Sequence, residues 1–239
     1  MFARRTASAA RVAHALLLRR VEYGESDLVI TLLTDTIGRV SALARGARKS
    51  VKRFGGVIEP MHTLHISYDD RSGAELVVLR EAKLSRARPF LVTSLERMQA
   101  AGQALNWVRK AAPPRTPEPE VWTALENLLD HLANPDDALS ARARLAATGL
   151  ELLSAFGWGI DFERCVSCGK APLPGQAGAV DAARGGLVCR NCGGARRRLS
   201  GSERVALSRA ATGGELDDES AALALDLVEQ ALKAHGGIE

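Results

Sequence analysis

Two short segments decide how this chain is interpreted: CVSCG at residues 165–169 and CRNCG at residues 189–193. They contain the four cysteines of the sequence, arranged as two C-x2-C pairs with 20 residues between them. This spacing is typical of a structural zinc site, in which four thiolates enclose the ion and leave no position open for a substrate. The sequence therefore predicts one structural, non-catalytic zinc ion, bound by Cys165, Cys168, Cys189 and Cys192.

The residues around the cysteines suit such a site. Gly169 and Gly193 follow the second cysteine of each pair, where glycine allows a sharp turn about a metal through a positive φ angle. Basic residues flank both pairs and would offset the negative charge that four thiolates leave on zinc: Arg164, Lys170, Arg190 and Arg196–Arg198. Two disulfides, a redox pair and an iron–sulfur cluster are the alternatives. Disulfides need an oxidising compartment, for which the sequence shows no secretory signal, and redox C-x2-C pairs occur singly.

The composition is that of an ordinary globular protein. The chain has 239 residues, enough for one large domain or two to three small ones, with 46% hydrophobic and 25% charged residues. The net charge of +4 favours an anionic partner. No apolar run has the length of a membrane span, so we expect no membrane association and a cytoplasmic location. The first ten residues, MFARRTASAA, faintly resemble a transit peptide, and an unstructured start or a misplaced start codon explains them equally well.

The first third of the chain has the pattern of a small β-barrel. Apolar or alternating segments between turn residues predict five short strands, at residues 12–21, 28–33, 39–44, 64–68 and 76–79. Five strands within about 70 residues favour a closed or nearly closed barrel, because closure removes free sheet edges.

Helical periodicity follows the barrel. Apolar residues recur at three- and four-residue spacing and predict helices at residues 91–108, 121–132, 145–156, 202–211 and 220–234. Ser200 and Glu203 have the spacing of a capping box, and the proline-rich segment 111–119 is expected to be a surface loop. The fold class is therefore α+β and multidomain. We expect a barrel domain with a short N-terminal arm over residues 1–85, a helical domain over 86–160 and 200–239, and a zinc module inserted at 161–199.

The segment between Asp35 and Glu59 contains six basic residues and no acidic one: Arg39, Arg45, Arg48, Lys49, Lys52 and Arg53. Glycines interrupt the run, which predicts a strand end and a loop rather than a helix. Six cations without compensation attract a phosphate backbone by releasing its condensed counterions, so the segment predicts nucleic-acid binding. The alternative is a charged loop that is simply solvated.

Aromatic residues make up only 4% of the chain. Tyr23, Phe54 and Tyr68 are the candidates in the barrel for stacking on bases, and Tyr68 is also a candidate for the core. We therefore expect binding to depend mainly on charge and strongly on salt. Glu25 or Asp27 is expected to shape a barrel turn rather than to contact DNA.

Two enzymatic interpretations fail on the residues. The segment 46–50 resembles the end of a nucleotide-binding P-loop, but Arg48 stands where that motif requires glycine, and Gly55–Gly56 would break the helix that must follow. A metallo-hydrolase is disfavoured because all four cysteines are used as ligands and no histidine has ligand spacing to them. The sequence therefore predicts a protein that is not an enzyme.

Several segments, taken in order, resemble the family of the bacterial recombination mediator RecO: residues 21–29 (VEYGESDLV), 38–40 (GRV), 44–50 (ARGARKS), 59–60 (EP), 157–165 (GWGIDFERC) and 185–189 (GGLVC). The resemblance covers most of residues 12 to about 210. It departs from the family in a longer segment before Val12 and in a C-terminus that lacks a longer basic ending.

This resemblance implies an OB-fold followed by a helical domain with a zinc module. It also implies a recombination mediator of DNA repair that binds single- and double-stranded DNA and anneals complementary strands. Its expected partners are RecR and the C-terminal tail of the single-strand binding protein, so that RecA can load onto coated DNA at the bacterial nucleoid. Arg142 and Arg144 are candidates for contacting the acidic tail by charge alone. The competing hypothesis is a zinc-ribbon module that binds proteins, as in a transcription or assembly factor.

Overall fold

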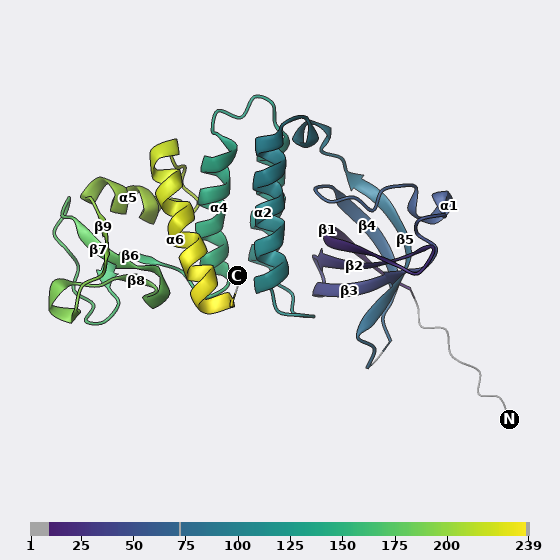
Figure 1. Cartoon of the computed structure of the whole chain (residues 1–239), viewed down its shortest axis with the longest axis horizontal. Coiled ribbons are helices and arrows are strands. Elements are labelled where there is room, and N and C mark those ends of the chain that lie inside the picture. The colour runs from purple at the N-terminus through teal and green to yellow at the C-terminus, as the bar shows by residue number, and fades with distance from the viewer. Residues whose placement is uncertain (1–9, 72, 238–239) are drawn as a thin grey trace. The chain divides into compact units, whose positions relative to one another are not determined.

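The computed structural model describes residues 10–71 and 73–237, which form two compact units (Figure 1). Of the described residues, the first unit contains 10–71, 73–88 and 112–122, and the second contains 89–111 and 123–237. Most of the predicted N-terminal arm, residues 1–9, lies outside the described residues.

The first unit is built on a closed barrel of five strands: β1 (Arg11–Tyr23), β2 (Asp27–Thr34), β3 (Gly38–Ala44), β4 (Thr63–Asp69) and β5 (Leu76–Arg86). The strands are hydrogen-bonded in the order β1-β2-β3-β5-β4, and β1 closes the barrel against β4. All pairs are antiparallel except β3 with β5. This is the topology of an OB-fold, so the predicted barrel is confirmed. The strands β1 and β5 are longer than the sequence pattern indicated.

Strict alternation of side chains fills the barrel interior. Along β3 every second residue is buried, from Gly38 to Ala44, because successive side chains of a strand point to opposite faces. The buried residues from all five strands form one apolar cluster, which includes Leu17, Ile30 and Leu79.

One end of this cluster is covered by α1 (Val51–Phe54), whose Phe54 ring is 1% exposed. The expectation of a loop without helix was wrong here. Gly55 does end the helix, at φ 47°, but a single turn forms before it and directs Phe54 into the core.

The proline-rich segment after Ala111 packs on the barrel. The Arg39 Nε donates a 2.6 Å hydrogen bond to the Ala112 carbonyl, and the Arg115 amide donates to the Arg39 carbonyl at 2.8 Å. The Arg115 guanidinium forms an ion pair with Asp70 at 3.0 Å. The segment predicted as a surface loop is therefore held against β3.

The second unit contains most of the helices. They are the 3-10 helix η1 (Pro89–Thr93) and the α-helices α2 (Leu95–Ala111), α3 (Pro119–Ala133, which begins in the first unit), α4 (Ala141–Ala155), α5 (Gly201–Ala210) and α6 (Asp218–Gly236). Figure 1 shows α2, α4 and α6 side by side. They approach closely at Gly149 of α4, where a Cβ atom would lie 3.0 Å from Val228 and 3.2 Å from Trp107. The predicted capping box of Ser200 and Glu203 is present at the start of α5.

A small sheet lies between α4 and α5 in the sequence. Its strands are β6 (Asp161–Cys165), β7 (Gly178–Asp181), β8 (Gly186–Leu187) and β9 (Arg197–Leu199), in the order β6-β8-β7-β9, with the 3-10 turns η2 (Ala182–Arg184) and η3 (Arg190–Cys192). The cysteine module is thus inserted between helices, as predicted. No helix in the described part of the chain has the length and apolarity needed to cross a bilayer.

Candidate metal centre and nucleic-acid interface

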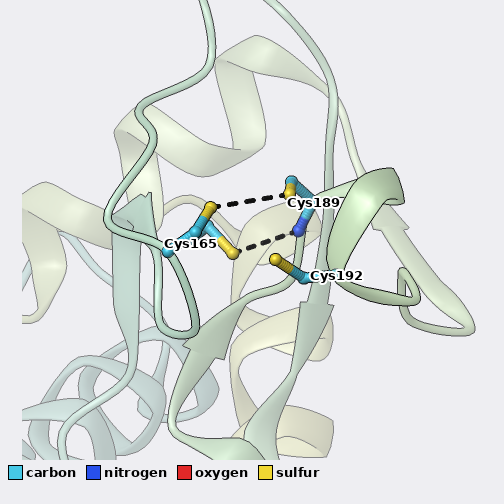
Figure 2. A group of neighbouring side chains, drawn as sticks. Cys165, Cys189 and Cys192 are labelled. Carbon is cyan, nitrogen blue, oxygen red and sulfur yellow. Dashed lines mark hydrogen bonds between the residues drawn. The ribbon is translucent and has the colours of Figure 1, made fainter.

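The four cysteine sulfurs converge on one point. All four lie within 4.8 Å of one another, and Figure 2 labels three of them, Cys165, Cys189 and Cys192. The Sγ atoms of Cys168 and Cys189 are 3.8 Å apart. Tetrahedral zinc–sulfur bonds of about 2.3 Å place sulfurs about 3.8 Å apart, whereas a disulfide requires about 2.0 Å. All four cysteines are free thiols. The predicted set is therefore brought together in an arrangement that can hold a metal ion.

Tight turns aim the sulfurs inward. The Gly169 amide donates to the Cys165 carbonyl at 2.8 Å, and the Cys192 amide donates to the Cys189 carbonyl at 2.9 Å. Gly169 has φ 71° and Gly193 has φ 100°, both in the left-handed region that favours glycine. The role predicted for these two glycines is confirmed.

The electrostatics of the cluster favour a bound cation. The Cys189 amide points at the Cys165 Sγ, 3.3 Å away, and this hydrogen bond and one from the Ser167 amide lower the pKa of Cys165 to about 6 (Figure 2). Hydrogen bonding to the sulfurs of Cys189 and Cys168 raises the pKa of Cys192 to about 12. Sulfurs this close cannot all be anionic unless a cation lies among them. Soft thiolate ligands in a tetrahedral set suit zinc or iron.

Five of the six predicted DNA-binding cations gather at one end of the barrel, in the connection from β3 through α1. We call residues 45–53 the basic loop. Its cationic side chains are all exposed: Arg45, Arg48, Lys49, Lys52 and Arg53.

Hydrogen bonds fix the shape of the basic loop. The Gly46 amide donates to the Asp27 carboxylate at 2.7 Å, so Asp27 shapes this turn as expected. The Arg48 amide donates to the Ser26 carbonyl at 3.0 Å, which ties the loop to the β1–β2 turn. Within the loop, the Arg53 Nη2 donates to the Arg45 carbonyl at 2.7 Å.

The charge of the loop is partly compensated, which corrects the interpretation from sequence. Glu22 of β1 forms an ion pair with Arg48 at 3.2 Å, although the two residues are 26 positions apart. Lys49 and Lys52 form no ion pair with any residue in 10–71 or 73–237. These two lysines are therefore available to a ligand, as is Arg45, which is exposed and likewise forms no ion pair among the described residues.

A hollow of about 530 Å³ lies beside the basic loop. Leu28, Phe54 and Ile58 give it an apolar floor, and Arg20 and Glu59 form an ion pair at its rim. The hollow is the mouth of the barrel where α1 covers the core.

Arg39 is not part of this cluster. It lies at the start of β3, whereas Arg45 follows the end of that strand, about 20 Å away at about 3.3 Å per residue. Its guanidinium is held by the Ala112 carbonyl. This contact could not be predicted from the sequence, because Ala112 is 73 residues away from Arg39.

The aromatic candidates separate by burial. Phe54 is 1% exposed and Tyr68 is 2% exposed, so their rings belong to the core and cannot stack on bases. Tyr23, at the end of β1, is 60% exposed. The sequence analysis had named Tyr68 as a candidate for the core, but it could not separate Tyr23 from Phe54.

Arg142 and Arg144, the two arginines predicted to contact an acidic tail, differ in whether they are already paired. The Arg144 guanidinium forms a 2.9 Å ion pair with Asp137, whose side chain is 5% exposed, and lies 3.6 Å from Glu215. Burial acts to raise the pKa of Asp137, but hydrogen bonds from Arg144 and Leu139 prevail and hold that pKa below its ordinary value. Arg144 is therefore engaged within its own unit, whereas Arg142 is exposed.

Comparison with known proteins gives matches along almost the whole chain. Residues 12–88 match the family model described as recombination protein O N terminal, and residues 92–239 match recombination protein O C terminal. The DNA repair protein RecO of Anaeromyxobacter sp. (strain K) is 38% identical over 177 residues, covering 74% of this chain and 68% of that protein. The DNA repair protein RecO of Myxococcus xanthus (strain DK1622) is 35% identical over 193 residues, covering 81% and 76%. The protein of the same name from Geobacter metallireducens is 32% identical over 179 residues, covering 75% and 71%.

Proposed function

The chain belongs to the recombination protein O family, and from this premise we propose that it is a non-enzymatic recombination mediator in DNA repair. It binds single- and double-stranded DNA, anneals complementary strands, and acts with RecR to help RecA load onto strands coated by the single-strand binding protein. The observation that carries the DNA-binding part is the basic loop, which presents five exposed cations at one end of an OB-fold barrel.

We assign the phosphate contacts to the basic loop: Arg45, Arg48, Lys49, Lys52 and Arg53. Each cation that neutralises a phosphate releases condensed counterions, and the gain in entropy drives binding without regard to base sequence. Arg39 was predicted to join this set. The position of Arg39 and its hydrogen bond to Ala112 give that prediction no support. We propose instead that Arg39 holds the proline-rich segment after Ala111 on the barrel.

Annealing follows from the same electrostatics. Two single strands repel each other through their phosphates, and the repulsion must be reduced before complementary bases can meet. A loop that carries several cations on one rigid turn lowers this repulsion for both strands at once. Such a surface needs no bond-making residue, which is why we infer that the protein is not an enzyme.

We propose that the four cysteines hold one zinc ion. Zinc is favoured by the tetrahedral sulfur spacing and by the closed set of four thiolates, which leaves no open position for catalysis. The ion would link the turn after β6 to the turn that precedes β9, and would stabilise a sheet whose strands are too short to hold together alone.

The remaining assignments rest on the family. We propose RecR and the acidic tail of the single-strand binding protein as partners, with Arg142 as the candidate contact for the tail because Arg144 is already paired. We retain the division into a DNA-binding domain at 1–85, a helical domain at 86–160 and 200–239, and a zinc module at 161–199. Reduced cysteines and a DNA substrate fit the bacterial cytoplasm, at the nucleoid.

The test is direct binding of purified protein to labelled 30-nucleotide single strands and 30-base-pair duplexes, followed by fluorescence annealing of complementary strands. The variant Arg48→Ala/Lys49→Ala/Lys52→Ala/Arg53→Ala should lose most of both activities. Wild-type protein that binds neither DNA form and captures only proteins would refute the proposal and favour the zinc-ribbon interaction factor. A fourfold variant with unchanged affinity would refute the assignment to the loop alone.

A further inference from the structure

We propose that the outer face of the barrel beside the basic loop is a platform for unpaired bases, with Tyr23 as the residue on which a base stacks. The inference rests on the proposed DNA binding and adds what the cations lack, namely a way to distinguish a single strand from a duplex.

The strand register creates an apolar row on this face. Val21 of β1 lies opposite Val29 of β2, Val29 lies opposite Leu43 of β3, and Leu43 lies opposite Val78 of β5. Residues opposite one another in a sheet point to the same side. None of the four is buried, and Val21 is 44% exposed. The chain neighbours of Val29, Leu43 and Val78 fill the core, whereas those of Val21, Arg20 and Glu22, are exposed and line the hollow. The row is therefore an apolar strip on the outside of the barrel.

Tyr23 extends this strip toward the basic loop. Alternation places Tyr23, two residues after Val21, on the same outer face, and Arg45 is the first residue after β3, at the end of the strip that Leu43 belongs to. The Tyr23 ring is 60% exposed, a large exposure for an aromatic side chain at the end of a strand. An exposed ring and an exposed guanidinium thus lie at the same edge of the apolar strip.

The ring and the cations belong to one rigid assembly. The β1–β2 turn that follows Tyr23 is joined to the basic loop by two hydrogen bonds, from the Arg48 amide to the Ser26 carbonyl at 3.0 Å and from the Gly46 amide to the Asp27 carboxylate at 2.7 Å. The ion pair of Arg48 with Glu22 adds a third link, next to Tyr23 itself. A ligand that binds both ring and loop therefore needs little ordering of the protein, which favours affinity.

This arrangement matches the chemistry of a single strand. Phosphates contact the loop cations while a base from the same strand lies on the Tyr23 ring, with neighbouring bases on the valine and leucine strip. Every base has a flat apolar face, so such stacking is independent of sequence. In a duplex these faces are already covered by neighbouring base pairs. The platform should therefore favour single strands and leave duplex binding to the cations.

The experiment compares Tyr23→Ala and Tyr23→Phe with wild type, using 30-nucleotide strands that contain 2-aminopurine. Tyr23→Ala should weaken single-strand binding about 5- to 100-fold, as expected for the loss of one stacked base, and should reduce the quenching of 2-aminopurine. Duplex affinity should stay within about twofold, and the slope of log affinity against log salt should not change, because stacking releases no counterions. Tyr23→Phe should retain wild-type behaviour. Phe90→Ala is the matched control, since Phe90 is 52% exposed and lies in the other unit.

The outcomes separate this inference from the proposed function. If wild type binds DNA and the fourfold loop variant does not, but Tyr23→Ala binds single strands normally, the platform is refuted and the mediator function stands. Equal losses for single strand and duplex in Tyr23→Ala would also refute it, because that result indicates a structural role, as would a lowered melting temperature. If wild-type protein does not bind DNA, the proposed function is refuted, and the platform is refuted with it.

Discussion

The double variant Lys49→Ala/Lys52→Ala isolates the electrostatic contribution of the basic loop. Both lysines are exposed and form no ion pair within the described residues, so their removal leaves no buried partner behind. For single strands, the slope of log affinity against log salt changes by about 0.7 for each phosphate contact. Losing two contacts should therefore lower the slope by about 1.4. At 0.1 M salt this corresponds to about 5-fold weaker binding per lysine, or about 25-fold for the pair.

The assay is fluorescence anisotropy of a labelled single strand at salt concentrations from 0.05 to about 0.5 M, a range chosen so that the counterion slope is linear. The two binding curves should converge as salt approaches about 1 M, where counterion release contributes nothing. Lys83→Ala/Lys233→Ala is the control, because it removes the same net charge from two exposed lysines that are not part of the loop.

Two results would refute this reasoning. If the control lowers the slope as much as the loop variant does, binding responds to net charge and not to the loop. If the loop variant binds 25-fold more weakly but keeps the wild-type slope, the lysines act through the structure of the loop and not through phosphates.

Three further predictions concern the metal site and the fold. Cys165→Ser should reduce bound zinc from one ion per chain to a small fraction and lower the melting temperature, measured by metal analysis and calorimetry; a variant that keeps both would show that the ligand set is wrong. Asp137→Asn should cost about 1–3 kcal/mol at pH 7, because it breaks the pair with Arg144. Since the folded pKa of Asp137 is lowered, its contribution is present above about pH 4 and lost as the pH falls through the folded pKa. Urea titrations of variant and wild type should therefore converge once the pH is below the folded pKa of Asp137, and a constant difference would contradict this assignment. Gly38→Ala should destabilise the barrel far more than Gly24→Ala. Both glycines have positive φ, but only at Gly38 would a Cβ atom lie 1.8 Å from a backbone carbonyl oxygen, that of Thr116 in the proline-rich segment. Equal melting temperatures for the two variants would show that the proline-rich segment does not pack against Gly38.

The sequence could predict what depends on neighbours in the chain. Burial alternates along β3, and the turn residues around it are local, so period-two patterning locates the barrel strands. The cysteine pairs are local in the same sense, because a C-x2-C turn sets two sulfurs together whatever surrounds it. The strands of the metal module escaped prediction because β8 has two residues and β9 has three, too few for any period to be visible.

Long-range contacts could not be predicted. The charge of Arg48 is compensated by Glu22, which belongs to β1 and is distant in the sequence. Arg39 is held away from the basic loop by the proline-rich segment after Ala111, which returns to β3 from 73 residues away. The burial of Phe54 depends on one helical turn between Ser50 and Gly55, which is shorter than any helix that periodicity detects. In each case the sequence identified the residue, but it could not identify the contact that decides the role of that residue.

The partial compensation of the basic loop also bears on how an annealing protein can release its product. A duplex carries about twice the phosphate charge per unit length of a single strand, so a loop of uncompensated cations would bind the annealed product more tightly than the substrate. Glu22 reduces this bias by pairing with Arg48, one of the five cations of the loop. The base platform inferred for Tyr23, which is 60% exposed, would oppose the bias directly, because a single strand offers the ring a base to stack on and a duplex does not. On the proposed function, charge would bring strands to the barrel, and we expect the balance between Glu22 and Tyr23 to set which form of DNA leaves first.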